Sequence, residues 1–152
     1  FGDAAGESDA ALASGDHAFA GACLDLGMLG AGEEYRARAS DVVASRAAEA
    51  LARPLGFGAL LAVATGLAAA PRQIVVVADE ADDPLARAAL VAGGAGGGAD
   101  VVAVVSERGA GEFATAGFSL FEAKTLSDGR ATAYDCREFV CRLPVTDPRE
   151  LG

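Results

Sequence analysis

Two cysteines near the carboxyl end of the sequence are the first candidates for chemistry. Four residues separate Cys136 from Cys141, whereas two separate the low-pKa redox pair of thioredoxin-type proteins. Residues five apart in an extended strand also point to opposite faces. The spacing therefore favours two buried or partly buried thiols, with a redox pair as the alternative. Zinc would need further ligands, and His17 and Cys23 are the remaining soft donors, so we expect no metal site.

The single histidine lies at the start of a predicted helix. His17 follows Asp16, and the helix dipole at this end disfavours a charged imidazole. Local spacing places no serine or cysteine beside it, so a surface or capping role is favoured over general-base catalysis. Catalysis with a nucleophile from a distant part of the sequence stays open as the alternative. Asp16 and His17 are kept as candidate ligand-binding residues.

A cluster of carboxylates, Asp79, Glu80, Asp82 and Asp83, follows a predicted buried strand. α/β folds often bind ligands at this end of a strand, and carboxylate oxygens suit divalent cations. However, Asp83 is explained as a helix cap, and acidic residues complement the dipole at a helix start. A solvated loop is therefore favoured over a cation site, and Asp79 is kept as a candidate ligand-binding residue.

A glycine-rich run at residues 93–98 resembles a phosphate-binding loop in composition but not in position. A dinucleotide loop lies between a strand and the amino end of the next helix, whereas this run follows the predicted helix. The place where phosphate would sit is acidic. We therefore interpret the run as a flexible connector and expect no nucleotide cofactor.

The periodicity of apolar residues predicts an α/β fold that positions these candidates. Helical spacing predicts antiparallel helical hairpins from helices at about 14–29, 33–52 and 57–70. The β-branched runs 74–77 and 101–105, with a short helix at 85–91 between them, predict a βαβ unit with parallel strands.

The chain is grouped as a single domain, residues 1–152, in three parts. These are helical hairpins over 1–70, the βαβ unit over 71–112 and an irregular or strand-like tail over 113–152. In the tail, Ser127-Asp128-Gly129 predicts a turn before a strand at 131–139. The hairpins are expected to pack on the sheet through their apolar side chains, Phe19, Leu26, Val42, Leu60 and Leu61.

Length and charge exclude several classes of protein. The 152 residues suit about one domain, and a net charge of −10 disfavours nucleic acid as a partner. No apolar run reaches the ~20 residues that span a bilayer, so no membrane association is expected. Three cysteines, an odd number, favour a reducing compartment over a secreted disulfide framework, and we predict a cytoplasmic protein.

The carboxyl-terminal string 131–151, ATAYDCREFVCRLPVTDPREL, resembles the closing motif of the spermatogenesis-associated thioredoxin-domain protein family. That motif runs T-A-Y-V-C-x-N-F-T-C-x-x-P-x-T-D-P-x-x-L, and the match includes the tyrosine, both cysteines, both prolines and the last leucine. Upstream, Ser14-Gly15-Asp16 is similar to the family's P-S-G-N element. Departures from the family pattern are Ala13 for proline, Asp16 for asparagine and Glu138 for asparagine. Residues 33–36 and 71–76 resemble a helix start and a strand of the family.

The resemblance implies the carboxyl-terminal portion of a longer architecture. Family members combine a thioredoxin-like domain with an α/α toroid similar to those of sugar epimerases and six-hairpin glycosidases. The first hypothesis is a non-catalytic or catalytically incomplete scaffold or interaction portion, which contacts the rest of its own polypeptide or a second copy. One alternative is part of a carbohydrate-acting toroid enzyme with Asp16 and His17 at the pocket rim. Another is a thiol-redox accessory that uses Cys136 and Cys141.

The glycine run yields the first testable prediction. Calorimetric titration of the chain with NAD or ATP should show no heat of binding, because the carboxylates that follow the first strand repel phosphate. A dissociation constant tighter than about 0.1 mM, equivalent to roughly 5–6 kcal/mol, would contradict the interpretation as a connector.

Overall fold

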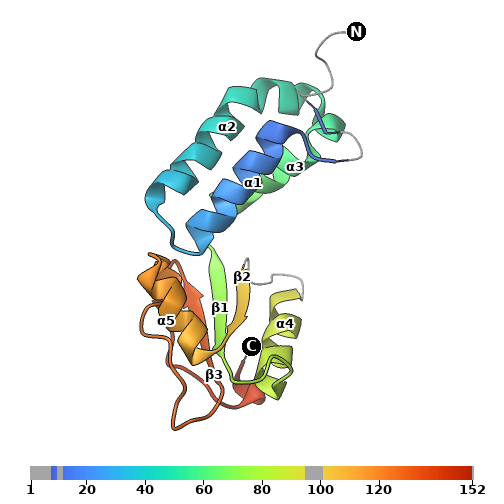
Figure 1. Ribbon diagram of the computed structural model, residues 1–152. Helices are drawn as coiled ribbons and strands as arrows, with labels where there is room; N and C mark the ends of the chain where they lie inside the picture. The colour runs from blue at the N-terminus through green and yellow to red at the C-terminus, as the bar shows by residue number, and fades with distance from the viewer. Residues whose placement is uncertain (1–7, 10–11, 95–100, 152) are drawn as a thin grey trace. The chain divides into compact units, whose positions relative to one another are not determined.

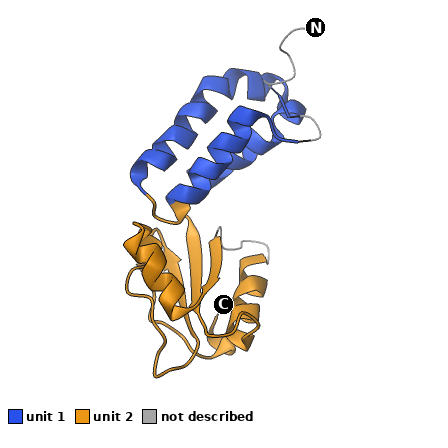
Figure 2. Cartoon of the chain, viewed as in Figure 1, with its two compact units in different colours: residues 1–27, 32–69 blue, residues 28–31, 70–152 orange. Residues whose placement is uncertain are grey.

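The computed structural model describes residues 8–9, 12–94 and 101–151, and these form two compact units (Figure 2). Unit 1 comprises residues 1–27 and 32–69, and unit 2 comprises residues 28–31 and 70–152. The change of unit near residue 70 lies where the helical hairpins were predicted to end. The single domain predicted for residues 1–152 concerns cooperative folding and stays a prediction.

Unit 1 is built from helices at the predicted places. These are α1 (Gly15–Met28, whose last residue belongs to unit 2), α2 (Glu33–Ala52) and α3 (Gly58–Ala68), and the short 3-10 helix η1 (Pro54–Gly56) links the last two (Figure 1). Ser14 caps α1, since its Oγ accepts a hydrogen bond from the His17 backbone N–H at 3.4 Å. Pro54 ends α2 because proline disfavours helical geometry at the preceding residue.

The interior of unit 1 combines small side chains with large ones. Ala20, Ala39 and Ala50 are buried where the helices meet, together with Phe57 and Leu60. Alanine lets helix backbones approach closely, but it buries little apolar area per residue. The few large side chains therefore contribute a large share of the hydrophobic stabilisation of this unit.

Unit 2 contains a mixed sheet of strands β1 (Arg72–Val77), β2 (Val101–Val105), β3 (Thr132–Arg137) and β4 (Val140–Cys141), in the order β2-β1-β3-β4. β1 and β2 are parallel, with Val75 opposite Ala103, and α4 (Pro84–Gly94) lies between them in sequence. β3 runs antiparallel to both β1 and β4. The α/β class, the amino-terminal helices and the parallel βαβ unit are thereby confirmed. The glycine run falls mostly outside the described residues, after the end of α4 at Gly94.

Both faces of β1 are covered by elements of unit 2. On one face, Leu85 and Ala89 of α4 pack with Ile74 and Val76. On the other face, Val75 and Val77 pack with Leu120 and Phe121 of the 3-10 helix η2 (Ser119–Phe121) and with a partly buried side chain of α5 (Glu107–Thr115). A second 3-10 turn, η3 (Pro148–Glu150), closes the tail near α4.

The two faces of the sheet are thus covered within unit 2, by α4 on one face and by α5 and η2 on the other. The expectation that the helical hairpins pack on the sheet through Phe19, Leu26, Val42, Leu60 and Leu61 concerns contacts between the two units and stays a prediction. Phe19 is half exposed. The sequence of α5, ERGAGEFAT, does not predict a helix, because it contains two glycines, which have low helix propensity.

The core of unit 1 can be tested at Leu60. Leu60→Asp should destabilise the helical unit by several kcal/mol, because it places an unpaired carboxylate at a position that is 1% exposed. Thermal unfolding followed by circular dichroism measures the loss. Leu55→Asp is the matched control, since Leu55 is fully exposed and the same charge should leave the transition nearly unchanged. Equal effects of the two substitutions would contradict the assignment of this core.

Candidate functional site

The two carboxyl-terminal cysteines face each other across a tight hairpin. β3 and β4 are joined by Glu138 and Phe139, and Cys136 is the direct partner of Cys141 in the register. The structure joins the two sulfurs in a disulfide, with Cα atoms 3.8 Å apart. Cys136 is fully buried, Cys141 is partly exposed, and Cys23 is a buried free thiol.

The disulfide corrects the prediction of two separate thiols. That prediction treated residues 131–139 and beyond as one extended strand, in which Cys136 and Cys141 point to opposite faces. The chain instead reverses at Glu138 and Phe139, whose φ angles are 49° and 65°, the positive values typical of a two-residue hairpin turn. The Arg142 N–H donates to the Asp135 carbonyl at 2.9 Å. The cysteines therefore occupy the closely spaced type of antiparallel pair, where side chains approach most nearly.

A buried glutamine anchors the hairpin turn. Gln73 lies beside Cys136 in the register of β1 and β3 and is fully buried. Its Nε2 donates to the Met28 carbonyl at 2.7 Å, and its Oε1 accepts from the Phe139 N–H at 3.1 Å. Sequence reasoning missed this residue, because a glutamine beside a β-branched run has no motif of its own.

An ion pair links β1 and β3 on the face of the sheet opposite Gln73 and Cys136. Arg72 donates to both carboxylate oxygens of Asp135, from Nε to Oδ1 and from Nη2 to Oδ2, each at 3.0 Å. The side chains are 12% and 14% exposed. The hydrogen bonds to Asp135 raise the pKa of Arg72 further, although partial burial opposes this. Bidentate geometry fixes the register of β1 against β3 next to the cysteine pair.

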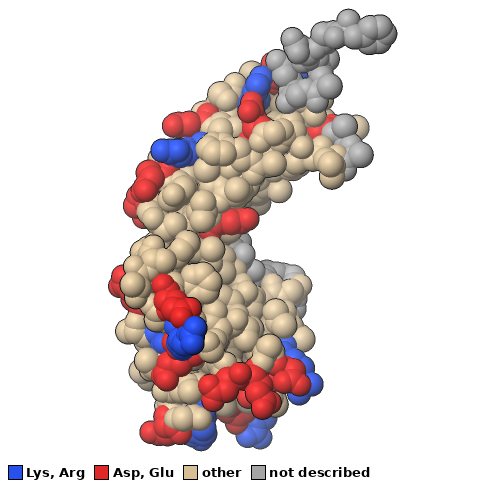
Figure 3. Space-filling view, in the orientation of Figure 1, with Lys and Arg blue, Asp and Glu red and all other residues tan. Residues whose placement is uncertain are grey.

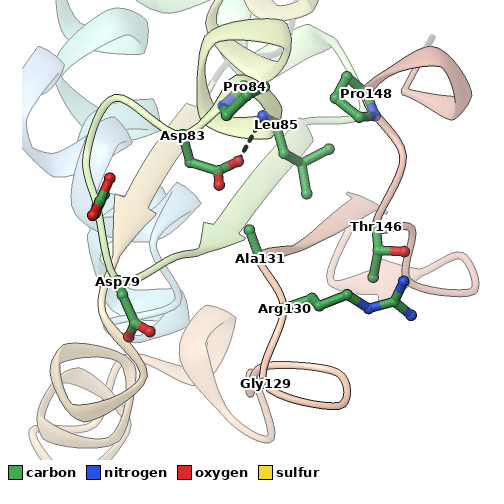
Figure 4. Close-up of a pocket in the computed structure, with 10 residues that line it drawn as sticks. Asp79, Asp83, Pro84, Leu85, Gly129, Arg130, Ala131, Thr146 and Pro148 are labelled. Atoms are coloured by element: carbon green, nitrogen blue, oxygen red, sulfur yellow. Dashed lines mark hydrogen bonds between the residues drawn. The ribbon is translucent and has the colours of Figure 1, made fainter.

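A surface pocket of about 470 Å³ lies at the carboxyl end of β1 (Figure 4). Asp79, Glu80 and Asp83 line it from the loop before α4, and Arg130 lines it from the turn before β3. Asp83 Oδ1 accepts the Leu85 N–H at 2.7 Å, which confirms its predicted role as the cap of α4. The predicted turn is present as well, since Ser127 bridges to Arg130 and Asp128 and Gly129 have positive φ.

The chemistry available in this pocket is that of charged groups open to solvent. Asp79, Glu80 and Arg130 are exposed, so water competes for each of them. In the described ranges, no group of three or more His, Cys, Asp or Glu side chains is placed to hold a metal ion. Asp79 thus lines a pocket whose charged side chains at Asp79, Glu80 and Arg130 are exposed to water.

His17 is buried, so the predicted surface role was wrong. His17 is 1% exposed, and its imidazole packs against the ring of Phe57 in a tilted arrangement, with ring centroids 5.2 Å apart. Nδ1 lies 2.7 Å from Asp9 Oδ1, while Nε2 has no hydrogen-bond partner among the described residues. Asp9 also accepts the Ser14 N–H at 3.0 Å and the Ala59 N–H at 2.8 Å. Asp9 therefore ties the first turns of α1 and α3 together, a role for which the sequence carries no motif.

Asp16 and His17 do not form a shared site. The Asp16 carboxylate is exposed and pairs with Arg46 of α2 at 3.2 Å. The imidazole of His17 points instead to Asp9 in the interior. Adjacent positions on α1 thus serve a surface ion pair and a buried hydrogen bond.

Carboxylates are spread over the visible surface of both units, with fewer basic side chains between them (Figure 3). This agrees with the net charge of −10. Within the part of the chain that the structure describes, no helix has both the length and the apolar content needed to cross a membrane.

Comparison with known proteins finds no matching family model, no matching curated protein and no matching solved structure. The resemblance to the thioredoxin-domain family therefore stays a prediction carried by the motif at 131–151. The local geometry described above is the basis for a functional proposal.

The hydrogen bonds to Asp9 predict a pH-dependent contribution to stability. Partial burial raises the pKa of Asp9, but hydrogen bonds from His17, Ala59 and Ser14 outweigh it and leave the pKa below its ordinary 3.8. The carboxylate thus stabilises the fold above that value, and the contribution is lost as the pH falls through the lowered pKa. Asp9→Asn should cost about 1–2 kcal/mol at pH 7, and the difference from wild type should shrink at pH 3.

Denaturant unfolding at the two pH values measures this difference. Asp16→Asn is the control, because Asp16 makes an exposed ion pair and its loss should change stability by less than about 1 kcal/mol. A loss for Asp9→Asn that is the same at pH 3 and pH 7 would rule out the charged hydrogen-bonding role.

Proposed function

We propose that this chain is a scaffold or interaction portion of a larger thioredoxin-domain-containing protein, with no complete catalytic centre of its own. The observation that carries the proposal is an apolar groove of about 170 Å³ on the surface of unit 1. All seven residues that line it lie on two helices, Val43, Ala47, Ala50 and Leu51 on α2 and Leu60, Leu61 and Ala64 on α3.

The groove suits an apolar helix as its occupant. α2 and α3 pack against each other, and most of the residues that line the groove follow one another at intervals of three or four along their helices. Such a row of apolar side chains is the kind of surface on which a third helix packs. Leu51 is 79% exposed and Leu55, in the link between the helices, is fully exposed. Covering these side chains would remove apolar surface from water and stabilise the complex.

The proposed occupant is a helix from the rest of the same polypeptide. This choice rests on the resemblance at residues 131–151, which implies a chain of which these residues are the carboxyl-terminal portion. We propose a cytoplasmic location as well. The odd number of cysteines no longer argues for that location, because two of the three form a disulfide, Cys136 and Cys141.

The carbohydrate-acting alternative receives no support from the geometry of its candidate residues. That hypothesis requires Asp16 and His17 at one pocket rim. Asp16 instead pairs with Arg46, and the imidazole of His17 is buried against Phe57.

Cysteine labelling tests whether the groove is covered. Leu51→Cys should react rapidly with a maleimide in the isolated chain and much more slowly in the native polypeptide that extends it. Val91→Cys is the matched control, because Val91 is 71% exposed on α4 of unit 2 and should react equally in both.

Two outcomes would contradict the proposed occupant. Equal labelling of Leu51→Cys in the two proteins would show that the rest of the polypeptide does not cover the groove. Labelling that slows as the isolated chain is concentrated would identify a second copy as the occupant.

A further inference from the structure

The two cysteines of the hairpin disulfide differ in burial. Cys136 lies in β3 and is 0% exposed, whereas Cys141 lies in β4 and is partly exposed. β4 has two residues and is the last strand in the sheet order, so in the described part of the chain no strand pairs with its outer side. An attacking thiolate can therefore reach Cys141 from the open edge, and Cys136 becomes the leaving group.

The side chains around Cys141 suit attack by a thiol on a protein better than attack by a small polar thiol. Val140 precedes it and is 76% exposed, and Leu143 follows two positions later and is 89% exposed. A partner that docks at this edge would cover both apolar side chains. Such contacts orient an attacking sulfur, which a small hydrophilic thiol cannot match.

The turn beside the disulfide is held in an unfavourable backbone conformation. Glu138 and Phe139 both have positive φ, which a side chain with a Cβ disfavours. The disulfide closes the turn on one side. Hydrogen bonds from Phe139 N–H to Gln73 Oε1 at 3.1 Å and from Glu138 N–H to the Pro71 carbonyl at 3.0 Å hold it on the other. Loss of the covalent bond removes one of these constraints, so the redox state of the pair is coupled to the order of the turn.

We infer that Cys136 and Cys141 form a reversible thiol–disulfide exchange site whose substrate is a protein dithiol. This activity is independent of the groove proposed for unit 1. The pair accepts two electrons from the partner's dithiol, and reduction loosens the hairpin that Gln73 anchors.

The exchange proceeds in two balanced steps. A partner thiolate attacks Cys141 Sγ, the bond between the two sulfurs of the hairpin breaks, and Cys136 leaves as a thiolate that takes a proton from water. The partner's second thiolate then attacks the partner sulfur of the mixed disulfide, and Cys141 leaves as a thiolate that is protonated in turn. The hairpin gains two electrons and two protons, and the partner becomes an intramolecular disulfide.

A partner dithiol completes the reduction faster than a monothiol does. After the first step, the Cys136 thiol can reverse the reaction, and a monothiol must wait for a second molecule to attack the mixed disulfide on Cys141. A second thiol on the same partner completes the reduction at high effective concentration.

A matched pair of single variants tests which sulfur is attacked. With Cys23 replaced by alanine in both, Cys136→Ser leaves Cys141 as the reporter and Cys141→Ser leaves Cys136. Reaction with a chromogenic aromatic disulfide should be faster for the Cys141 reporter by about tenfold or more, because Cys141 is partly exposed in the edge strand whereas Cys136 is buried. Equal rates, or a faster Cys136, would overturn attack at Cys141.

The wild-type chain provides the second test, which does not depend on the folding of the variants. Dithiothreitol without denaturant should reduce the pair, and its oxidised form should restore the bond. Reduced glutathione at the same thiol concentration should reduce the pair more slowly than dithiothreitol and through a mixed disulfide, which acid trapping and peptide mapping should locate at Cys141. A bond that resists dithiothreitol until the protein is unfolded would overturn the exchange site. Reduction by glutathione as fast as by dithiothreitol would overturn the preference for a dithiol.

Discussion

The buried side chain of Gln73 is the interaction on which the carboxyl-terminal site depends. Its amide joins the end of α1, through the Met28 carbonyl, to the hairpin turn, through the Phe139 N–H. Both ends of a buried amide must be paired, because an unsatisfied polar group costs about 1–3 kcal/mol. Gln73 lies opposite Cys136, so the same residue that satisfies the turn also lies beside the buried sulfur.

The strands that flank β1, which are β2 and β3, hold Gln73 in this position. β1 is buried on both faces from Gln73 onward, and it pairs with β3 over its whole length and with β2 from Gln73 to Val77. Arg72 adds a bidentate ion pair to Asp135, which fixes the register one position away from the cysteine pair. A one-residue slip would move Cys136 to the other face and break both contacts. The hairpin can therefore hold two non-glycine residues at positive φ.

The elements with a strong apolar period could be predicted from the sequence, whereas the site could not. The helices of unit 1, the β-branched strands β1 and β2 and the cap at Asp83 follow from local patterns. α5 was not predicted, because its glycines and charged residues give no clear helical pattern. As a result, the elements that cover one face of the sheet were not predicted either. The hairpin was missed because Glu138-Phe139 lacks the Asn-Gly or Asp-Gly pattern that marks such turns. Asp9 and Gln73 act through partners distant in sequence, which no local pattern reveals.

The central claim is that the disulfide and the Gln73 anchor form one redox-dependent structure. A nuclear magnetic resonance titration of the full chain, from oxidised to reduced dithiothreitol, tests it directly. The Cβ resonances of Cys136 and Cys141 should move together from disulfide to thiol values. The side-chain amide of Gln73 and the backbone amide of Phe139 should shift with the same midpoint, while Cys23 stays unchanged. Cysteine resonances that remain at thiol values under oxidising conditions, or a Gln73 amide that does not respond when they change, would contradict the account.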